Sequence, residues 1–520
     1  ELMEETMSSS LIRGKYIVCG VSGGETVEVV EDGAVFQRDG EIVEIGGYGD
    51  VIARHRGEPE VGSDRHVVIP GMVNAHHHGN FSNCLMGCPD LPLELWLSVM
   101  WARRDIDPYL DALYCCMQLI ESGVTAAMHN HVRWIPPAGR GLLDDANRIL
   151  RAYEDAGMRV AFSVSMKDQN RIAYGDDHAF VRSLPPALGG ALASRLGSSS
   201  LSGDEYLALF EELYHQQRKT AGDRVRVFLS PGNLQWASDG LLIRMKKHAN
   251  GYGTGIHMHL LETAYQKAYS FKQFGKSGVA HLNDLGFLGP EVSCAHGLWL
   301  TEEDLDLLAR TGVTICHNAS SNLRLKSGIA PVNRMLAKGV RVAIGIDSTG
   351  INDDNDMLQE VRLVSKIHRV PGHDRPSPTS RQLLEMATLN GARAMLLSDQ
   401  VGTLEVGKRA DMVLLDLKAL TDPYLDPGIP FVDVLFQRAK VSHVDTVIID
   451  GEVVLHEGRF TRFNKEDLLK ELRQQLAQPL KSHELERKEL ARAVGPHLRD
   501  FYRGWLLDDT ELLDRYDART

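Results

Sequence analysis

A group of histidines near residue 76 has the spacing of metal ligands. His76 and His78 are separated by one residue and follow the short apolar stretch 68–75, which is typical of a buried strand. Successive strand residues point to opposite faces, so the two imidazoles project together while His77 points away. Such a pair supplies half of a metal site. From the triplet alone, a histidine-rich surface turn is an equally good interpretation, and ligands farther along the chain have to decide.

Eight apolar, β-rich stretches alternate with helical patterns in the central part of the chain. They lie at 72–74, 125–130, 159–164, 224–230, 255–259, 292–295, 313–317 and 342–347. This alternation predicts an α/β fold, a closed parallel (β/α)8 barrel of the TIM type. An open doubly wound sheet is the competing architecture. It requires a glycine-rich phosphate loop after the first strand, and none follows Met72.

Polar side chains recur where these predicted strands end, and in a parallel barrel the catalytic groups lie at those ends. They are His76, His78, His129, Asn130, His131, Gln235, His257, His259, His296, His317 and Asp347. One such histidine alone is best explained by ordinary hydrogen bonding. Imidazole or carboxylate at six strand ends is difficult to obtain by chance. Because His257 and His259 share a face, spacing alone does not choose between them.

The chemistry of this residue set is that of a catalytic metal site. Three or four nitrogen and oxygen ligands with an open position are typical of catalytic zinc, whereas closed structural sites are usually rich in thiolates. Such a metal lowers the pKa of a bound water toward about 7 and makes hydroxide available near neutral pH. Imidazole and carboxylate also suit iron, manganese and cobalt. The sequence therefore predicts metal-assisted hydrolysis.

Short β-rich stretches flank the barrel region on both sides. Residues 11–67 alternate such stretches with turns, including the hairpin dipeptides Asp32-Gly33 and Asp39-Gly40. Strand patterns return at 401–416 and 446–455. We therefore expect a composite β-sandwich domain from 11–67 and 401–460, a barrel domain from 68–400 and a helical C-terminal appendix from 461–520.

Two segments lie outside this alternation. Residues 171–201 contain Pro185, Pro186 and paired glycines, which predicts a long loop after the third barrel strand. In a barrel that loop emerges on the active-site face, so it is a candidate lid; an insertion without a role is the alternative. The charged helical segment 461–520 is expected to be a solvated appendix or a contact between subunits of a homo-oligomer.

Composition excludes several classes of partner. The 520 residues carry 57 basic and 70 acidic side chains, a formal charge of −13, and this balance argues against nucleic-acid and anionic-membrane surfaces. Seven scattered cysteines form no disulfide framework, which is typical of the reducing cytoplasm. No apolar run reaches transmembrane length. We expect a cytoplasmic protein with a small-molecule substrate.

Six stretches of the sequence together resemble the amidohydrolase superfamily. They are 70–78 (PGMVNAHHH), 257–263 (HMHLLET), 295–297 (AHG), 317–323 (HNASSNL), 345–347 (GID) and 402–411 (GTLEVGKRAD). The resemblance extends from about residue 11 to 460. It is closest to the branch that contains guanine, cytosine and S-adenosylhomocysteine deaminases and the triazine hydrolases.

This resemblance implies roles for individual residues. It implies one divalent metal ion, with zinc as the first expectation and iron, manganese or cobalt as alternatives. The implied ligands are His76, His78, His259 and Asp347. His259 is selected over the neighbouring histidine because the family's ligand stands three residues before the glutamate. Binuclear relatives carry a bridging lysine at the end of strand four, and 225–235 contains none.

The implied catalytic residues are Glu262, His296 and Asp347. By resemblance, Glu262 shuttles a proton to a ring nitrogen of the substrate. His296 polarises the attacking hydroxide or the developing oxyanion, and Asp347 takes the proton from water.

Substrate identity is less determined than the chemistry. The candidates for substrate contacts are Trp96, Asn130, Gln235 and His317. We predict an aminohydrolase (deaminase) that attacks an amino-substituted nitrogen heterocycle with metal-bound hydroxide. The alternative is hydrolysis of an amide, urea, carbamate or halogenated triazine at the same mononuclear site. A non-catalytic scaffold would typically have lost ligands, and this chain retains all of them.

Overall fold

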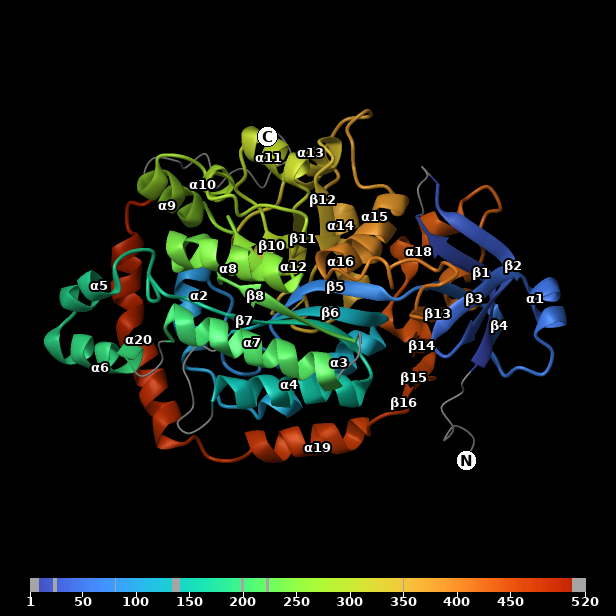
Figure 1. The fold of residues 1–520 in the computed structure, drawn as a ribbon, viewed down its shortest axis with the longest axis horizontal. Coiled ribbons are helices and arrows are strands. Elements are labelled where there is room, and N and C mark those ends of the chain that lie inside the picture. Colours follow the sequence, from blue (N-terminus) through green and yellow to red (C-terminus); the bar gives the residue numbers. More distant parts are fainter. Residues whose placement is uncertain are drawn as a thin grey trace.

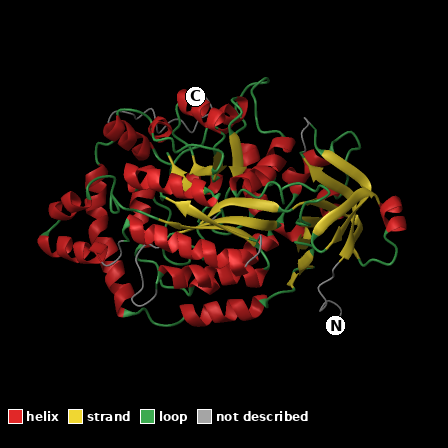
Figure 2. Ribbon diagram, in the orientation of Figure 1, coloured by secondary structure: helices red, strands yellow, loops and turns green. Residues whose placement is uncertain are grey.

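Two eight-stranded sheets form the framework of the molecule. The computed structural model describes residues 9–21, 26–79, 81–132, 141–197, 201–220, 224–348 and 350–506. One sheet is the wall of a barrel surrounded by helices, and the other lies to one side of it (Figure 1). Figure 2 shows the same division, with helices covering the barrel strands and the second sheet largely free of them.

The barrel strands follow one another in chain order and neighbouring strands are parallel. They are β5 (Met72–His77), β6 (Val124–His131), β7 (Arg159–Ser165), β8 (Val225–Ser230), β9 (Ile256–Leu260), β10 (Val292–His296), β11 (Thr314–His317) and β12 (Arg341–Ile344). The chain beyond β12 closes the ring, because Ile346 and Asp347 donate their main-chain N–H groups to the carbonyl oxygen of His76 at 3.2 and 2.8 Å. The predicted barrel is confirmed, with all eight strands near their expected positions.

The second sheet combines strands from both ends of the chain, as predicted. Its strands are β1 (Ser9–Gly20), β2 (Glu28–Arg38), β3 (Glu41–Gly47), β4 (Glu60–Pro70), β13 (Met412–Asp416), β14 (Val444–Ile449), β15 (Glu452–His456) and β16 (Arg459–Phe460). The junction is β4, which pairs with β1 on one side and with β13 on the other. The predicted domain limit at 67–68 falls inside β4, which leads directly into β5.

The two hairpin dipeptides behave differently. Asp39-Gly40 forms the turn between β2 and β3, with φ of 52° and 76°, as predicted. The expected turn at Asp32-Gly33 is wrong, because both residues lie inside β2. Gly33 pairs with Gly14 of β1, and a Cβ atom there would lie 2.5 Å from the Ile17 side chain. The glycine therefore permits close approach within the sheet.

Helices complete the molecule. They are α1 (Tyr48–Arg54), α2 (Leu93–Met100), α3 (Pro108–Glu121), α4 (Leu142–Ala156), α5 (Asp177–Ser183), α6 (Pro186–Gly197), α7 (Gly203–Thr220), α8 (Asp239–Tyr252), α9 (Ala264–Phe274), α10 (Gly278–Asp284), α11 (Glu302–Thr311), α12 (Ala319–Arg324), α13 (Val332–Ala337), α14 (Met357–Ile367), α15 (Ser380–Ala387), α16 (Leu389–Ala394), α17 (Leu417–Thr421), α18 (Phe431–Arg438), α19 (Lys465–Leu476) and α20 (Ser482–Tyr502), with short 3-10 turns at Leu234–Trp236 and Val441–His443. Sequence signals explain their ends. Thr301 and Asp304 form a capping box before α11, and Gly312 ends it in the left-handed conformation.

The long loop expected at 171–201 is wrong for its described part. The segment folds into α5 and α6, and residues 198–200 lie outside the described residues. Pro186 is the first residue of α6, where its missing N–H group has no cost. A Cβ atom at Gly189 would lie 2.7 Å from the carbonyl oxygen of Val181, so this glycine allows α5 and α6 to pack. Proline and glycine therefore mark a helix start and a helix contact here.

The C-terminal helix α20 packs on the barrel's active-site end, beside α2, α5 and α6 (Figure 1). Arg487 forms an ion pair with Asp105 at 2.7 Å and donates to the carbonyl oxygen of Arg103 at the same distance. Val494, Leu498 and Tyr502 are buried. The expected solvated appendix is therefore wrong for the inner face of α20. Residues 507–520 lie outside the described part of the chain.

All seven cysteines are free thiols, in line with the predicted absence of a disulfide framework. In the described ranges, no helix combines the length and the apolar character that crossing a bilayer requires.

Candidate metal centre

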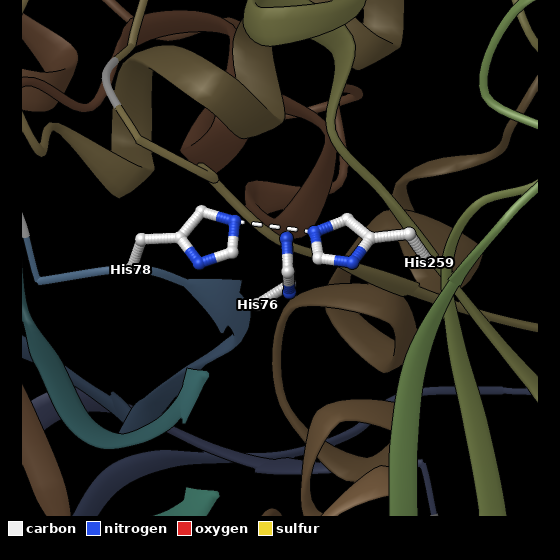
Figure 3. Close-up of side chains that lie close together, drawn as sticks. All are labelled: His76, His78 and His259. Carbon is white, nitrogen blue, oxygen red and sulfur yellow. Dashed lines mark hydrogen bonds between the residues drawn. The ribbon is translucent and has the colours of Figure 1, made fainter. Parts of the chain in front are cut away.

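Four side chains converge at the carboxyl end of the barrel. His76 lies in β5, His78 just after it, His259 in β9 and Asp347 just beyond β12. The Nε2 atoms of His78 and His259 are 3.2 Å apart, and His76 points to the same position (Figure 3). Asp347 Oδ1 lies 3.2 Å from His78 Nε2 and 3.5 Å from His76 Nε2. The structure thus brings the four predicted ligands together.

Each histidine is oriented through its other ring nitrogen. Nδ1 of His78 donates to the carbonyl oxygen of Asn130 at 2.6 Å, and Nδ1 of His259 donates to that of Gly232 at 2.8 Å. His76 Nδ1 lies 2.7 Å from Nε2 of His257. A histidine that donates from Nδ1 keeps a free lone pair on Nε2, the form that binds metal.

His257 is therefore a supporting residue behind the cluster. Its Nε2 bonds to His76, and its Nδ1 lies 2.8 Å from the Ser293 hydroxyl. His259, two residues on, directs Nε2 into the cluster. Sequence spacing left these two histidines equivalent. The carbonyl oxygen of Gly232 separates them, because it accepts from both the main-chain N–H and Nδ1 of His259.

Electrostatics favour the protonation states that bind a cation. Burial lowers the pKa of His76 and of His259 well below the ordinary imidazole value, so both rings are neutral. Burial opposes ionisation of Asp347, but its contacts with His76 and His78 outweigh burial and hold the pKa of this carboxyl well below its ordinary value. Neutral imidazoles and an ionised carboxylate are the ligand forms of a divalent metal.

The donor set fits a divalent metal ion. Nε2 of His76 is buried and has no hydrogen-bond partner among the described residues, and an unsatisfied buried nitrogen costs free energy unless something binds it. The ligand atoms of His76, His78 and His259 lie within 4.8 Å of one another. Three imidazoles and one carboxylate without a thiolate are a catalytic type of site.

A second carboxyl group lies beside the cluster. Glu262 is buried, and its Oε2 lies 3.6 Å from Nε2 of His296. Burial raises the pKa of Glu262 well above its ordinary value, and the negative charges of Asp347 and Glu94 add to this shift. The raised pKa favours the protonated form of Glu262, whereas the lowered pKa of Asp347 favours its ionised form. A neighbouring acid and base of this kind can move protons during hydrolysis.

His296 completes the group of reactive side chains. Its Nδ1 lies 2.9 Å from Asn322 Oδ1, and its Nε2 faces Asp347 Oδ2 at 3.8 Å. His296 and Asp347 both have positive φ, 79° and 67°. Such backbone is strained in residues other than glycine and clusters at functional sites. Here it turns both side chains inward at the ends of their strands.

A family model described as the amidohydrolase family matches residues 67–454 of the chain. The chain belongs to the amidohydrolase family. The matched range covers the barrel, and therefore all four converging side chains.

Relatives of this amidohydrolase carry deaminase names. This chain is 29% identical over 449 residues to a 5'-deoxyadenosine deaminase from Methanosarcina acetivorans, and the alignment covers 85% of this chain and 93% of the relative. It is 30% identical over 476 residues to a 5-methylthioadenosine/S-adenosylhomocysteine deaminase from Desulforamulus reducens, with 91% and 99% covered. An adenosine deaminase structure from Xanthomonas campestris with bound zinc matches with 27% identity and a TM-score of 0.75, covering 92% of this chain and 98% of that one.

A cavity of this amidohydrolase adjoins the cluster of converging side chains. His78, His259, Glu262, His296 and Asp347 all line it, and Trp96 forms part of its wall. Of the four side chains predicted to contact substrate, Trp96 alone is among the described residues that line this cavity.

The other three predicted contact residues lie behind the cavity. Asn130 accepts a hydrogen bond from Ser163 at 3.3 Å, and its carbonyl oxygen supports His78. Gln235 is buried, and its carbonyl oxygen accepts from Asn170. His317 lies 3.0 Å from His368 through their Nε2 atoms. These residues hold the strand ends in place.

Sequence reasoning missed Lys167, which lines the cavity together with Trp236. Lys167 is two residues beyond β7. It follows a strand end, so a search of the loops after the strands for cationic side chains could have found it.

Proposed function

We propose that this amidohydrolase is a zinc-dependent aminohydrolase that removes the exocyclic amino group of an adenine-type heterocycle. The observation that carries the proposal is the placement of two buried carboxyl groups, Glu262 and Asp347, on either side of His296 at a cluster of histidines, with burial raising the pKa of Glu262 and the imidazole contacts lowering that of Asp347. Deamination of an aromatic ring requires an acid that protonates a ring nitrogen. The deaminase names of the relatives support the same substrate class.

The proposed ligands are His76, His78, His259 and Asp347. When bound, a divalent metal supplies hydroxide near neutral pH by lowering the pKa of a water molecule. Zinc is proposed because the adenosine deaminase structure that resembles this chain contains it. The hydrogen bonds from Nδ1 of His78 and His259 fix the rings before any ion binds, so little reorganisation is needed.

The proposed reaction uses three side chains. Asp347 accepts a proton from the attacking water, and Glu262 delivers a proton to the ring nitrogen as the amino-bearing carbon becomes tetrahedral. His296, oriented by Asn322, hydrogen-bonds the attacking oxygen and places it between the two carboxyl groups. Asp347 then passes the proton it accepted to the amino group, the carbon–nitrogen bond breaks and ammonia leaves, and the added hydroxyl loses its proton to Glu262 as the carbonyl group of the product ring forms.

The cavity walls fit a flat apolar ring. Trp96 and Trp236 line the cavity together with leucines at 93, 97 and 325. Aromatic side chains bind planar heterocycles by stacking and exclude water.

Ammonia release tests this function. The zinc-loaded protein is offered 5'-deoxyadenosine, adenosine, guanine, cytosine and an aminotriazine, and ammonia is measured together with bound zinc. We expect turnover of an adenine compound at one zinc per chain and loss of both zinc and turnover in His78→Ala. If no amino-heterocycle releases ammonia and a urea, carbamate or halogenated triazine is hydrolysed instead, the alternative hydrolase is established. Wild-type protein without stoichiometric metal would indicate a scaffold.

A further inference from the structure

A lysine forms part of the wall of the cavity that holds the reactive side chains. Lys167 lines the same cavity as His259 and Glu262. Its Nζ lies 3.3 Å from the centroid of the Trp236 ring, and that ring lies 6.4 Å from the ring of His259. Trp236 is therefore a neighbour of both the ammonium group and a proposed metal ligand, and all three side chains line one cavity.

Main-chain hydrogen bonds fix the position of Lys167 relative to Trp236. On one side, Met166 donates its N–H to the carbonyl oxygen of Ser230 at 2.9 Å. On the other side, Asp168 donates to the carbonyl oxygen of Trp236 at 3.0 Å and accepts from Ser238 at 2.8 Å. Because both neighbours are tied to the segment that carries Trp236, the lysine is built into this wall.

The surroundings of Lys167 favour a negatively charged ligand. Apolar side chains such as Leu93, Leu97 and Val132 line the same cavity, and burial lowers the pKa of Lys167 to about 7. Asp177 attracts this ammonium, but it also forms an ion pair with Arg171 at 2.9 Å. An anionic group bound in the cavity offsets the cost of burying the ammonium and is recognised by it in turn.

We propose that Lys167 binds a carboxylate on the substituent of the heterocycle, so that the enzyme prefers an adenine derivative with a carboxylate-bearing side chain over a neutral one. This inference rests on the proposed deaminase function. Lys167 then determines specificity, while Glu262, His296 and Asp347 carry out the reaction.

Three substrates that differ in this group test the proposal. S-adenosylhomocysteine carries a carboxylate, its methyl ester lacks that charge, and 5'-deoxyadenosine is neutral. In the zinc-loaded enzyme, Lys167→Met is expected to raise KM for S-adenosylhomocysteine about 10- to 100-fold, the usual effect of losing a charged hydrogen bond. KM for the ester and for 5'-deoxyadenosine is expected to change less than about threefold, and Lys167→Arg is expected to recover part of the loss.

Lys272→Met is the matched control. Lys272 is exposed and lies over the ring of Trp505 at 4.8 Å, so its replacement removes a similar lysine–tryptophan contact away from the cavity. We expect Lys272→Met to leave KM for all three substrates unchanged. If Lys167→Met raises KM equally for the charged and the neutral substrates, or raises KM for none of them, the proposal is overturned.

Binding measurements separate this proposal from the proposed reaction. Calorimetric titration of S-adenosylhomocysteine and its ester into the metal-free forms of wild-type and Lys167→Met protein reports recognition without turnover. If no adenine compound releases ammonia but wild type still binds the carboxylate form more tightly and the variant does not, the deaminase function fails and the subsite stands. If turnover occurs and the two forms bind wild type equally, the subsite fails and the function stands.

Discussion

At the scale of single residues, protonation divides the work between two carboxyl groups. Asp347 contacts two imidazoles, whereas Glu262 is buried and is affected by the negative charges of Asp347 and Glu94. The two carboxyl groups thus have pKa values shifted in opposite directions, which is how one site supplies both an acid and a base.

Glu262→Gln is expected to lower kcat about 10²- to 10⁴-fold, the usual contribution of a general acid. The amide keeps the size of the side chain but has no proton to transfer. Because the pKa of Glu262 is raised, the active protonated form exists at neutral pH and is lost as pH rises through that pKa. Wild-type kcat/KM is therefore expected to fall on the alkaline side, and this fall is expected to disappear in the variant. Steady-state rates across pH measure both effects.

Glu303 is exposed, so Glu303→Gln serves as the control and is expected to keep the wild-type rate and pH profile. An unchanged alkaline limb in Glu262→Gln would assign the ionisation to another group.

His257→Phe is expected to weaken zinc binding about 10- to 100-fold, because His76 loses the partner that orients its ring. Competition with a chelator measures the affinity. His368→Phe removes another buried histidine that is paired with a histidine, His317, outside the metal cluster, and is expected to leave affinity unchanged. The same loss in both variants would indicate general destabilisation.

At the scale of elements, the C-terminal helix α20 is connected to the segment that carries Glu262 by buried hydrogen bonds. The hydroxyl of Tyr502 in α20 accepts from the main-chain N–H of Tyr174 at 3.1 Å. The Tyr174 hydroxyl accepts from Gln266 at 3.2 Å, and Gln266 in turn accepts from the N–H of Glu262 at 2.8 Å. Helix α20 lies beyond the range that the family model matches, yet it supports the segment carrying Glu262.

Tyr502→Phe is expected to lower kcat about 10-fold with a smaller change in KM, because the segment that carries Glu262 loosens while the cavity walls remain. A displacement of about 1 Å at such a site costs about 10²-fold, so a partial loosening costs less. Steady-state kinetics separate kcat from KM. Tyr214→Phe removes a tyrosine hydrogen bond of 2.7 Å to the carbonyl oxygen of Tyr252, away from this path. If both variants lower kcat equally, the connection has no role in positioning.

At the scale of the whole molecule, a buried ionic cluster joins the barrel to the second sheet. Arg159 at the start of β7 donates two hydrogen bonds to Asp411, at 2.9 and 3.1 Å, and one to Asp450 at 2.8 Å. Asp411 ends the GKRAD stretch that contributed to the family resemblance. Its structural task is to fix the sheet against the amino-terminal end of the barrel, opposite the reactive side chains.

Arg159→Met is expected to lower the free energy of unfolding by about 3–5 kcal/mol, because it leaves the buried carboxylate of Asp411 without its ion-pair partner, whereas Asp450 keeps Arg224 and Arg409. Urea denaturation measures this change. Arg151→Met removes an exposed pair with Asp155 and is expected to cost about 0–1 kcal/mol. Similar costs for the two variants would show that the cluster adds no stability.

The division into 11–67 with 401–460, 68–400 and 461–520 stays a proposal, with β4 continuous across the first limit. Cytoplasmic location and the absence of nucleic-acid and membrane partners remain predictions from composition, and assembly into a homo-oligomer remains a prediction from the charged segment 461–520.

The sequence alone determined the barrel and the ligand set. Strand periodicity predicts that side chains two apart share a face, and parallel strands bring their carboxyl ends to one rim, so His76, His78 and Asp347 could be placed together without coordinates. Tertiary structure decided the rest. His257 and His259 share a face, and spacing left them equivalent; in the structure the carbonyl oxygen of Gly232 orients His259 toward the cluster, while His257 supports His76. Lys167 and Trp236 follow strand ends in loops, whose course depends on packing and not on any short-range pattern.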